Sequence, residues 1–174
     1  MPGNASGPSS RTTQNAKDDW RELISEEGRF KIKFPGEPVE EVNKFGTTTI
    51  HDFKVVKPAV EWRISYADDE NFARDPTSLK ETYSRSVDSL QRENRKLILK
   101  KDIYLKNRLG IEFILEDQDS ISTTRSFLVG QRLYQVSVKK QKKLSSPVEA
   151  DLSRAVKEFF DSFNFWEANE PQPN

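Results

Sequence analysis

The chain has 174 residues, one histidine and no cysteine, and its 28 lysine and arginine residues are balanced by 28 aspartate and glutamate residues. This length predicts one domain, the balanced charge gives no argument for nucleic-acid or membrane binding, and the lack of cysteine excludes disulfides and thiol nucleophiles in this chain. No apolar run approaches the roughly 20 residues that span a bilayer.

Residues 1–18 are predicted to be a disordered tail, because they offer almost no apolar surface to offset the entropy cost of ordering. Two interpretations stay open: a sequence left over from processing, together with a linker, or a tether that holds the domain away from a membrane. No leader pattern is visible, so we expect a cytosolic protein or a mature form whose leader has been removed. The folded domain is predicted over residues 19–167, with residues 168–174 frayed.

Three strands are predicted first. Residues 30–34 alternate between apolar and polar and end in a proline-glycine turn. A second strand covers residues 47–56, and Lys57-Pro58 predicts a hairpin to the third. The third strand has one apolar face and one polar face that is expected to be exposed to solvent. Its apolar face is formed by Val60, Trp62, Ile64 and Tyr66.

A helix is predicted next, from Pro76 to about Asn94, with Asp75 as its cap. Its apolar stripe consists of Leu79, Tyr83, Val87 and Leu90. Further strands are predicted at residues 97–99, 109–115, 121–129 and 133–138. Gly130 opens a two-residue loop between the last two, which favours a type II′ hairpin turn.

The last element is predicted to be a helix with Ser146 as its cap, Pro147 at its first position and Glu149 completing a capping box. Its broad apolar face predicts core packing rather than a partner groove. That face comprises Val148, Leu152, Ala155, Val156, Phe159, Phe160 and Phe163.

The order of elements predicts an α+β fold. Three strands, a helix, about four strands and a helix indicate an antiparallel β-sheet of about six to seven strands sandwiched by helices.

Several segments resemble domains of the PsbP/Mog1 type. Trp20, followed by Glu-Gly-Arg-Phe-Lys-Ile-Lys-Phe-Pro-Gly-Glu-Pro at residues 27–38, is similar to their opening strand and proline turn. Residues 62–68 resemble their central strand, residues 126–136 their late hairpin, and residues 159–163 their closing helix. The resemblance extends from Trp20 to about Trp166.

This resemblance implies an α/β/α sandwich and a non-enzymatic role. PsbP-like members are lumenal or membrane-tethered assembly or extrinsic factors of photosystem II, Mog1-like members bind a small GTPase, and many bacterial relatives are exported lipoproteins. A membrane tether is implied if a leader and a lipid-modified cysteine precede this chain in the native protein. No diagnostic ligand motif aligns, so no partner or metal site is carried over.

Candidate metal ligands are few. His51 is expected to share a strand face with Phe53 and Val55, either satisfied locally or paired with a carboxylate around a metal. Two acidic connections are expected to be solvated turns or, alternatively, oxygen-ligand sites for calcium or manganese. Their residues are Asp68, Asp69, Glu70, Asp117 and Asp119.

Two basic clusters are candidate contacts for an acidic protein, lipid headgroups or phosphate, the alternative being solvated charge at a strand end. One contains Lys139, Lys140, Lys142 and Lys143. The other contains Arg92, Arg95, Lys96, Lys100 and Lys101. No aromatic residue interrupts residues 139–143, so nucleic acid is not expected as a partner.

No nucleophile or nucleotide-binding motif occurs, so we expect no enzyme. The leading hypothesis is a non-catalytic protein-binding or assembly module of PsbP/Mog1 type, located outside the cytoplasm in a periplasm or thylakoid lumen and linked to photosystem II or envelope complex assembly. One alternative is a metal- or small-ligand-binding protein that uses the acidic loops. The other is a cytosolic adaptor that binds a GTPase.

Overall fold

The computed structural model describes residues 19–70, 72, 76–91 and 94–170. The predicted tail of residues 1–18, the predicted cap Asp75 and the basic residue Arg92 lie outside the described residues, as do the last four residues of the predicted frayed end. Within the described residues, neither helix is long and apolar enough to cross a membrane.

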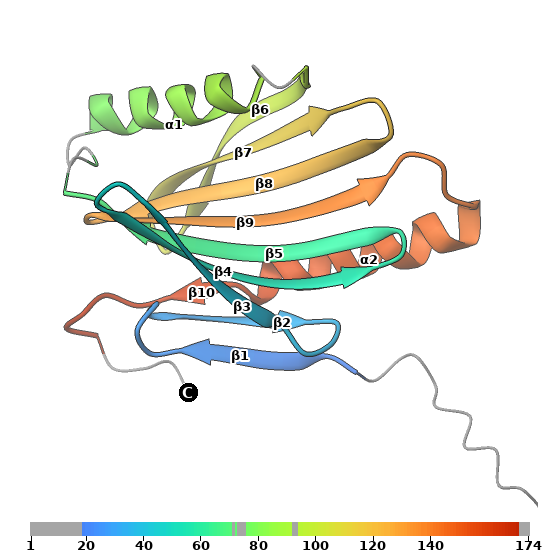
Figure 1. Cartoon of the computed structure of the whole chain (residues 1–174), viewed down its shortest axis with the longest axis horizontal. Coiled ribbons are helices and arrows are strands. Elements are labelled where there is room, and N and C mark those ends of the chain that lie inside the picture. Colours follow the sequence, from blue (N-terminus) through green and yellow to red (C-terminus); the bar gives the residue numbers. More distant parts are fainter. Residues whose placement is uncertain (1–18, 71, 73–75, 92–93, 171–174) are drawn as a thin grey trace, which may run out of the picture.

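Ten strands and two helices form the described chain (Figure 1). In chain order they are β1 (Arg21–Ser25), β2 (Phe30–Phe34), β3 (Val39–Phe45), β4 (Thr48–Lys57), β5 (Val60–Asp68), α1 (Pro76–Gln91), β6 (Lys96–Leu105), β7 (Arg108–Glu116), β8 (Ser120–Val129), β9 (Arg132–Gln141), α2 (Ser146–Ser162) and β10 (Asn164–Phe165).

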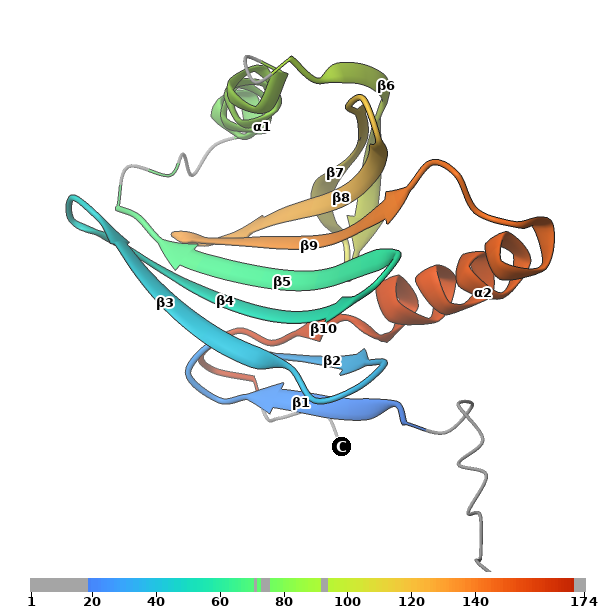
Figure 2. The ribbon, with the colours of Figure 1, turned by 45° about the vertical axis from the view of Figure 1, so that its right-hand side comes forward.

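The strands form two antiparallel sheets, which confirms the predicted α+β class. The large sheet has seven strands in the order β3-β4-β5-β9-β8-β7-β6, and the small sheet has the order β1-β2-β10. The helix α2 and the small sheet pack on one face of the large sheet, which we call the core face. The helix α1 lies over the opposite face, which we call the second face (Figures 1 and 2).

Three strands were not predicted, and one was predicted too short. All seven residues of β3 are exposed, and β1 buries little, so neither strand carries the apolar alternation on which the prediction rested. β10 has only two residues. The strand predicted at residues 97–99 extends from Lys96 to Leu105, because backbone pairing with β7 rather than an apolar pattern holds its second half.

The start of α2 was predicted one residue too late. Ser145, not Ser146, is the N-cap, with an extended backbone and no side-chain capping bond. The predicted capping box is also wrong, because the Glu149 carboxylate accepts a hydrogen bond from the Lys140 ammonium instead. A charge-assisted bond to an ammonium is stronger than a neutral bond back to a backbone N–H.

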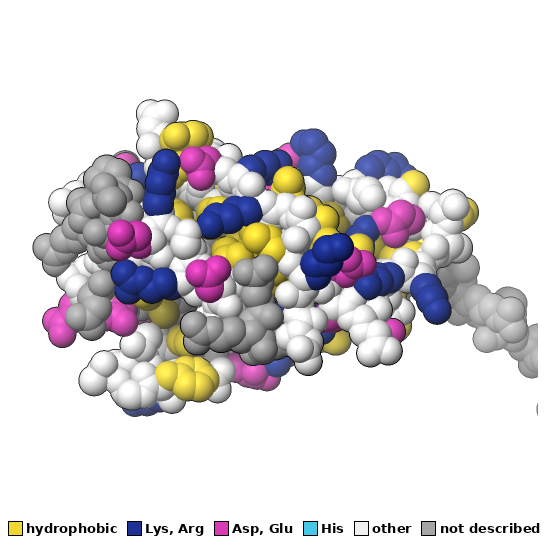
Figure 3. Space-filling view, turned by 90° about the horizontal axis from the view of Figure 1, so that it is seen from above, with side chains coloured by type: hydrophobic (Ala, Val, Ile, Leu, Met, Phe, Trp, Pro, Cys, Tyr) yellow, Lys and Arg dark blue, Asp and Glu magenta, His cyan; other side chains and the backbone are white. Residues whose placement is uncertain are grey.

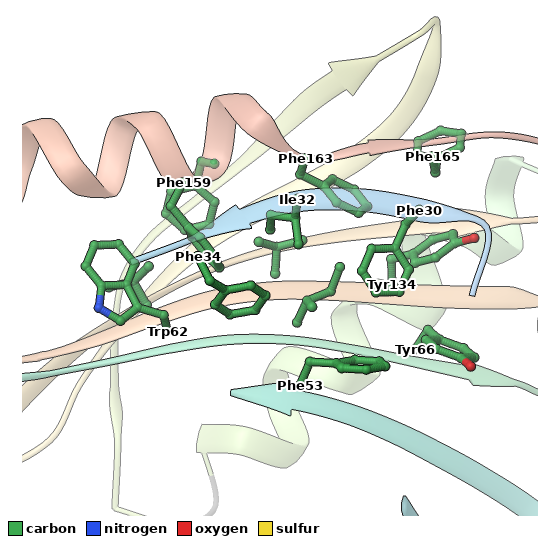
Figure 4. Packing of buried hydrophobic residues seen from close by; sticks show 14 of the residues in the cluster. Phe30, Ile32, Phe34, Phe53, Trp62, Tyr66, Tyr134, Phe159, Phe163 and Phe165 are labelled. Atoms are coloured by element: carbon green, nitrogen blue, oxygen red, sulfur yellow. The ribbon is translucent and has the colours of Figure 1, made fainter. Parts of the chain in front are cut away.

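Aromatic side chains fill the core face (Figure 4). Phe30 of β2 is fully buried, and its ring lies 5.8–6.4 Å from the rings of Phe53, Tyr66, Tyr134 and Phe163. Each such pair contributes about 0.5–1.5 kcal/mol beyond the burial of its area. A single residue of the small sheet thus joins strands β4, β5 and β9 to the chain that follows α2.

The phenylalanines of α2 complete this core. Phe159 lies 5.3 Å from the rings of both Phe34 and Trp62, and it is fully buried. Phe160 and Phe163 are 6% and 4% exposed. Their predicted role in core packing, rather than in a partner groove, is therefore confirmed.

Two-residue turns set the register of the hairpins. Gly130 opens the loop between β8 and β9 with a φ of 63°, as the predicted type II′ turn requires. The β4–β5 hairpin predicted at Lys57-Pro58 is also confirmed, since Lys57 pairs with Val60 across the loop. Lys106 and Asn107 join β6 to β7 with φ values of 48° and 62°, the backbone of a type I′ turn.

Tyr83 fixes α1 over β7 and β8. Its hydroxyl donates to the Leu109 carbonyl at 3.1 Å and accepts from the Leu128 N–H at 2.8 Å. The β7–β8 ladder ends one pair earlier, at Gly110 and Phe127, so the hydroxyl bridges the two strands there. Burial raises the pKa of Tyr83 to about 12, which keeps this hydroxyl protonated over the physiological range.

We expect Tyr83→Phe to lower the free energy of unfolding by about 1–3 kcal/mol, because it leaves the Leu128 N–H and the Leu109 carbonyl buried without their partner. Urea unfolding followed by circular dichroism measures the change. Tyr104→Phe removes the same atom from a side chain that is 71% exposed, so it serves as the control. Equal stability of the Tyr83→Phe and Tyr104→Phe variants would contradict the bridging role.

Candidate binding site

The second face is polar where α1 leaves it uncovered. Alternation along each strand determines this, because side chains next to core-facing residues point the opposite way. On β9, for example, Tyr134, Val136 and Val138 are buried in the core face, so Gln135, Ser137 and Lys139 point to the second face.

Three adjacent strands share this property, and we call the resulting surface the polar floor. The strand register places Arg63 opposite Ser137, and Ser137 opposite Thr124. The polar floor consists of Glu61, Arg63 and Ser65 on β5, Gln135, Ser137 and Lys139 on β9, and Ser122 and Thr124 on β8.

The polar floor forms the base of an open cavity of about 230 Å³. Arg95 and Leu115 complete its lining. Asn94 has a φ of 61° and turns the chain immediately before Arg95. Leu115 is the only apolar residue among the ten that line the cavity.

Each of the two cations of the polar floor has one ion-pair partner within the described residues. Arg63 donates through Nε to the buried Asp52 carboxylate at 2.6 Å, while its side chain stays 44% exposed. Lys139 lies 3.9 Å from Asp117, and its side chain is 49% exposed. Arg63 and Lys139 therefore retain N–H groups that could donate hydrogen bonds to an incoming carboxylate or phosphate.

Three hydroxyls of the polar floor form no hydrogen bond within the described residues. They belong to Ser65, Thr124 and Ser137, and none of them is among the fully buried atoms that lack a partner, so solvent reaches them. The centre of the sheet thus presents solvent-accessible hydroxyls beside two cations, which suits an anionic polar group.

Only some of the predicted basic residues lie at the cavity. Arg95 and Lys139 meet at the cavity, although they come from different predicted clusters. Lys140 pairs with Glu149, and Lys142 lies 2.8 Å from Glu116. This bond from Lys142 holds the pKa of Glu116 below its usual value.

The basic residues of β6 also have local partners. Lys101 lies 2.8 Å from Glu112, and Lys100 donates to the Ser84 hydroxyl at 2.9 Å. Lys96 faces Glu116 across the β6–β7 ladder. Lys143 is exposed beyond the end of β9. The face that carries α1 shows basic and acidic side chains interspersed rather than one continuous basic patch (Figure 3).

The Asp117 carboxylate forms its hydrogen bonds within its own turn. Its Oδ1 accepts from the N–H groups of Asp119 and Ser120 at 3.0 and 2.7 Å, and its Oδ2 accepts from the Ser120 hydroxyl at 2.6 Å. The bond from the Ser120 hydroxyl is the main cause that lowers the pKa of Asp117 to about 2, and the two N–H groups and Lys139 add to it.

Asp68 is bound by Arg132, a buried residue that sequence analysis did not single out. The Arg132 guanidinium contacts both Asp68 carboxylate oxygens at 2.6–2.7 Å and donates to the Glu27 carbonyl at 2.6 Å. Arg132 thereby ties β9 and β5 to the β1–β2 turn and holds the pKa of Asp68 below its usual value. Asp69 follows in the loop, where its N–H donates to the Gln131 carbonyl, and Glu70 is exposed.

His51 lies on the core face of β4, on the same side as Phe53 and Val55, as predicted. Its ring stacks on Tyr66 at a centroid distance of 4.6 Å, and Nδ1 lies 3.1 Å from a Glu40 oxygen. Among the described residues, no group of three or more histidine and carboxylate side chains is placed to hold a metal ion. Calcium or manganese binding stays a prediction.

Sequence analysis missed most of the polar floor. Within its own strand, each missed residue is an ordinary polar residue of the face expected to be exposed to solvent. These residues are Arg63, Ser65, Thr124, Gln135 and Ser137. Their only signal is that three strands that become neighbours carry polar residues at matching positions, and recognising it requires the strand order.

Three comparisons with known proteins bear on the fold. No family model matches the chain, and no curated protein matches it. Among solved structures, cyanobacterial PsbP (CyanoP) from Synechocystis sp. PCC 6803 is similar with a TM-score of 0.63 at 8% identity, over 91% of this chain and 98% of that one. The chain therefore has a PsbP-like fold, as the resemblance implied.

Two weaker matches carry no further argument. A protein of unknown function from Pseudomonas aeruginosa matches with a TM-score of 0.47 at 13% identity, over 89% of this chain and 99% of that one. A protein from Bacteroides thetaiotaomicron matches with a TM-score of 0.43 at 11% identity, over 89% of this chain and 52% of that one.

We expect the Asp117 carboxyl to titrate near pH 2 in a carbon-13 NMR titration, well below the ordinary value of about 3.9. Because the folded pKa is the lower one, the turn contributes stability in full above about pH 4 and loses it as the pH falls towards 2. Ser120→Ala should raise the midpoint, since it removes the largest cause.

Ser122→Ala is the matched control, because the Ser122 hydroxyl bonds to the Leu115 carbonyl and not to Asp117. It should leave the Asp117 midpoint unchanged. An Asp117 midpoint at the ordinary value in the parent protein would show that this turn is not closed by its carboxylate.

Proposed function

We propose that this domain is a non-catalytic protein-binding module that holds an acidic segment of a partner protein on its polar floor. One observation carries this proposal: the uncovered centre of the sheet combines two partly exposed cations, Arg63 and Lys139, with three solvent-accessible hydroxyls that form no hydrogen bond within the described chain. Carboxylates accept hydrogen bonds from such donors with the strength of charge-assisted bonds.

The chemistry of the cavity selects against an apolar ligand. Nine of its ten lining residues are polar, so an apolar group would cover hydroxyls and cations without replacing their bonds to water. Its volume of about 230 Å³ is below the roughly 300–1,000 Å³ of typical small-molecule sites. One or two acidic side chains of a partner protein suit this space better than a cofactor does.

The expectation of no catalysis is part of the same proposal. The chain has no cysteine, and its single histidine stacks on Tyr66 on the core face, away from the polar floor. The residues of the polar floor include one carboxylate, Glu61, so a pair of carboxylates for acid–base work is not assembled on it.

We place this module outside the cytoplasm, as an assembly or accessory factor of a membrane complex. Its PsbP-like fold supports this placement. Fractionation of cells that make the native protein tests the location. Recovery of the native protein in the cytosol would contradict it and would favour the cytosolic adaptor.

The central test is the loss of partner capture when the charge of the polar floor is reversed. The full chain is used to capture partners from the native host's membrane and soluble fractions, and the dissociation constant is then measured with the purified partner. Lys139→Glu should weaken binding about tenfold or more, because it replaces a charge-assisted bond by like-charge repulsion. Raising the salt concentration should weaken the parent complex as well.

Lys143→Glu is the matched control. It makes the same charge change four residues further along, at an exposed position outside the cavity, and it should leave the affinity nearly unchanged. Equal losses in both variants would assign the effect to net charge and contradict docking on the polar floor. Full retention by Lys139→Glu would contradict it directly, provided that all three proteins unfold at the same urea concentration.

A further inference from the structure

The two edge strands of the large sheet differ in how they are protected. On β6 the register with β7 shifts between Leu97 and Leu99, and Lys96, Lys100 and Lys101 line the strand. Bulges and lysines are common devices against edge-to-edge pairing. β3 runs in unbroken register with β4 from Val39 to Phe45 and has no other neighbour among the described strands.

β3 also exposes large apolar side chains. Val39, Val42 and Phe45 are 60%, 52% and 66% exposed, although valine and phenylalanine are typical of paired strands. The strand follows the outer margin of the large sheet (Figure 2). An exposed apolar edge of this length is the form of edge that accepts another strand.

We propose that β3 pairs antiparallel with β3 of a second copy of this chain, about a two-fold axis at Val42. The residues of β3 are Val-Glu-Glu-Val-Asn-Lys-Phe. In this register Val39 faces Phe45, Glu40 faces Lys44, Glu41 faces Asn43, and Val42 faces its own copy. Each pair is favourable or neutral, and each of the first three occurs twice.

The faces of the sheet agree with this pairing. Directly opposed residues in an antiparallel ladder point to the same face. Val39 and Phe45 both lie on the second face, whereas Glu40, Val42 and Lys44 lie on the core face. The pair of Val39 with Phe45 and the ion pair of Glu40 with Lys44 therefore fall on opposite faces of the joined sheet.

The symmetry of the pattern favours a second copy over an unrelated strand. An isologous interface requires a surface that is complementary to itself under a two-fold rotation. β3 has this property in both its charges and its apolar residues, and a foreign partner would not require it. Lys44 is exposed and has no ion pair within the described chain, so its ammonium can approach Glu40 of the second copy.

The first test is sedimentation velocity of the full chain from about 1 µM to about 1 mM, the range expected for a small interface of this kind. The parent should show a monomer–dimer equilibrium. Glu40→Lys or Lys44→Glu alone should weaken dimerisation about tenfold, because each places two like-charge pairs across the axis. The double variant restores opposite charges and should return the dissociation constant towards that of the parent.

Glu22→Lys on β1 is the control, because it reverses a charge at an exposed position of an edge strand in the small sheet. It should leave dimerisation unchanged. A parent that stays monomeric throughout, or a double variant as weak as the single variants, would overturn the proposal. A dimer unaffected by all β3 variants would place the interface elsewhere and overturn it too.

A second test uses the absence of cysteine from the chain. Val42→Cys places one thiol on the axis, where opposed Cα atoms lie about 4.5–5.5 Å apart, within the range of a disulfide. Val39→Cys is the control, since its two copies would lie about 20 Å apart. Under mild oxidation, Val42→Cys should form a covalent dimer and Val39→Cys should not. Equal cross-linking of both variants would contradict the register.

Discussion

The large sheet buries its core face much more fully than its second face, and most other features of the molecule depend on this constraint. The aromatic rings of β2, β4, β5, β9 and α2 close the core face and exclude water from it. The second face is covered mainly by α1 over β7 and β8, with Tyr83 fixing the helix there. Because side chains alternate along a strand, the polar side chains of β5, β9 and β8 are left exposed on the second face. The packing that stabilises the fold therefore also determines where a binding surface can lie.

The charged groups of the molecule act mainly as local clamps. Arg132 joins Asp68 to the β1–β2 turn, and Lys140 joins the end of β9 to the first turn of α2. Arg125 and Lys101 likewise hold Glu112 between neighbouring strands. What distinguishes the cations of the polar floor is their position beside solvent-accessible hydroxyls in a cavity, and strand order rather than the density of lysines in the sequence brings them together.

The sequence predicts those elements whose side chains alternate. β2, β5 and β9 each bury every second residue, so their period is visible without a structure. β1 and β3 were missed because edge strands need no buried face, and the α2 cap was misplaced because Glu149 binds Lys140 instead. For the site, Arg95 and Lys139 were identified, but in two separate clusters. Their proximity follows from the strand order, which pairwise backbone bonds establish and which no single strand encodes.

The small sheet links the beginning of the domain to its end. β2 pairs with β10, and the Lys33 N–H donates to the Ser162 hydroxyl, 129 residues further along. During synthesis on the ribosome, all strands of the large sheet are therefore made before α2 and β10, which cover part of its aromatic face. Until the last helix emerges, that part of the core face exposes apolar surface to solvent, which is the condition under which nascent chains aggregate.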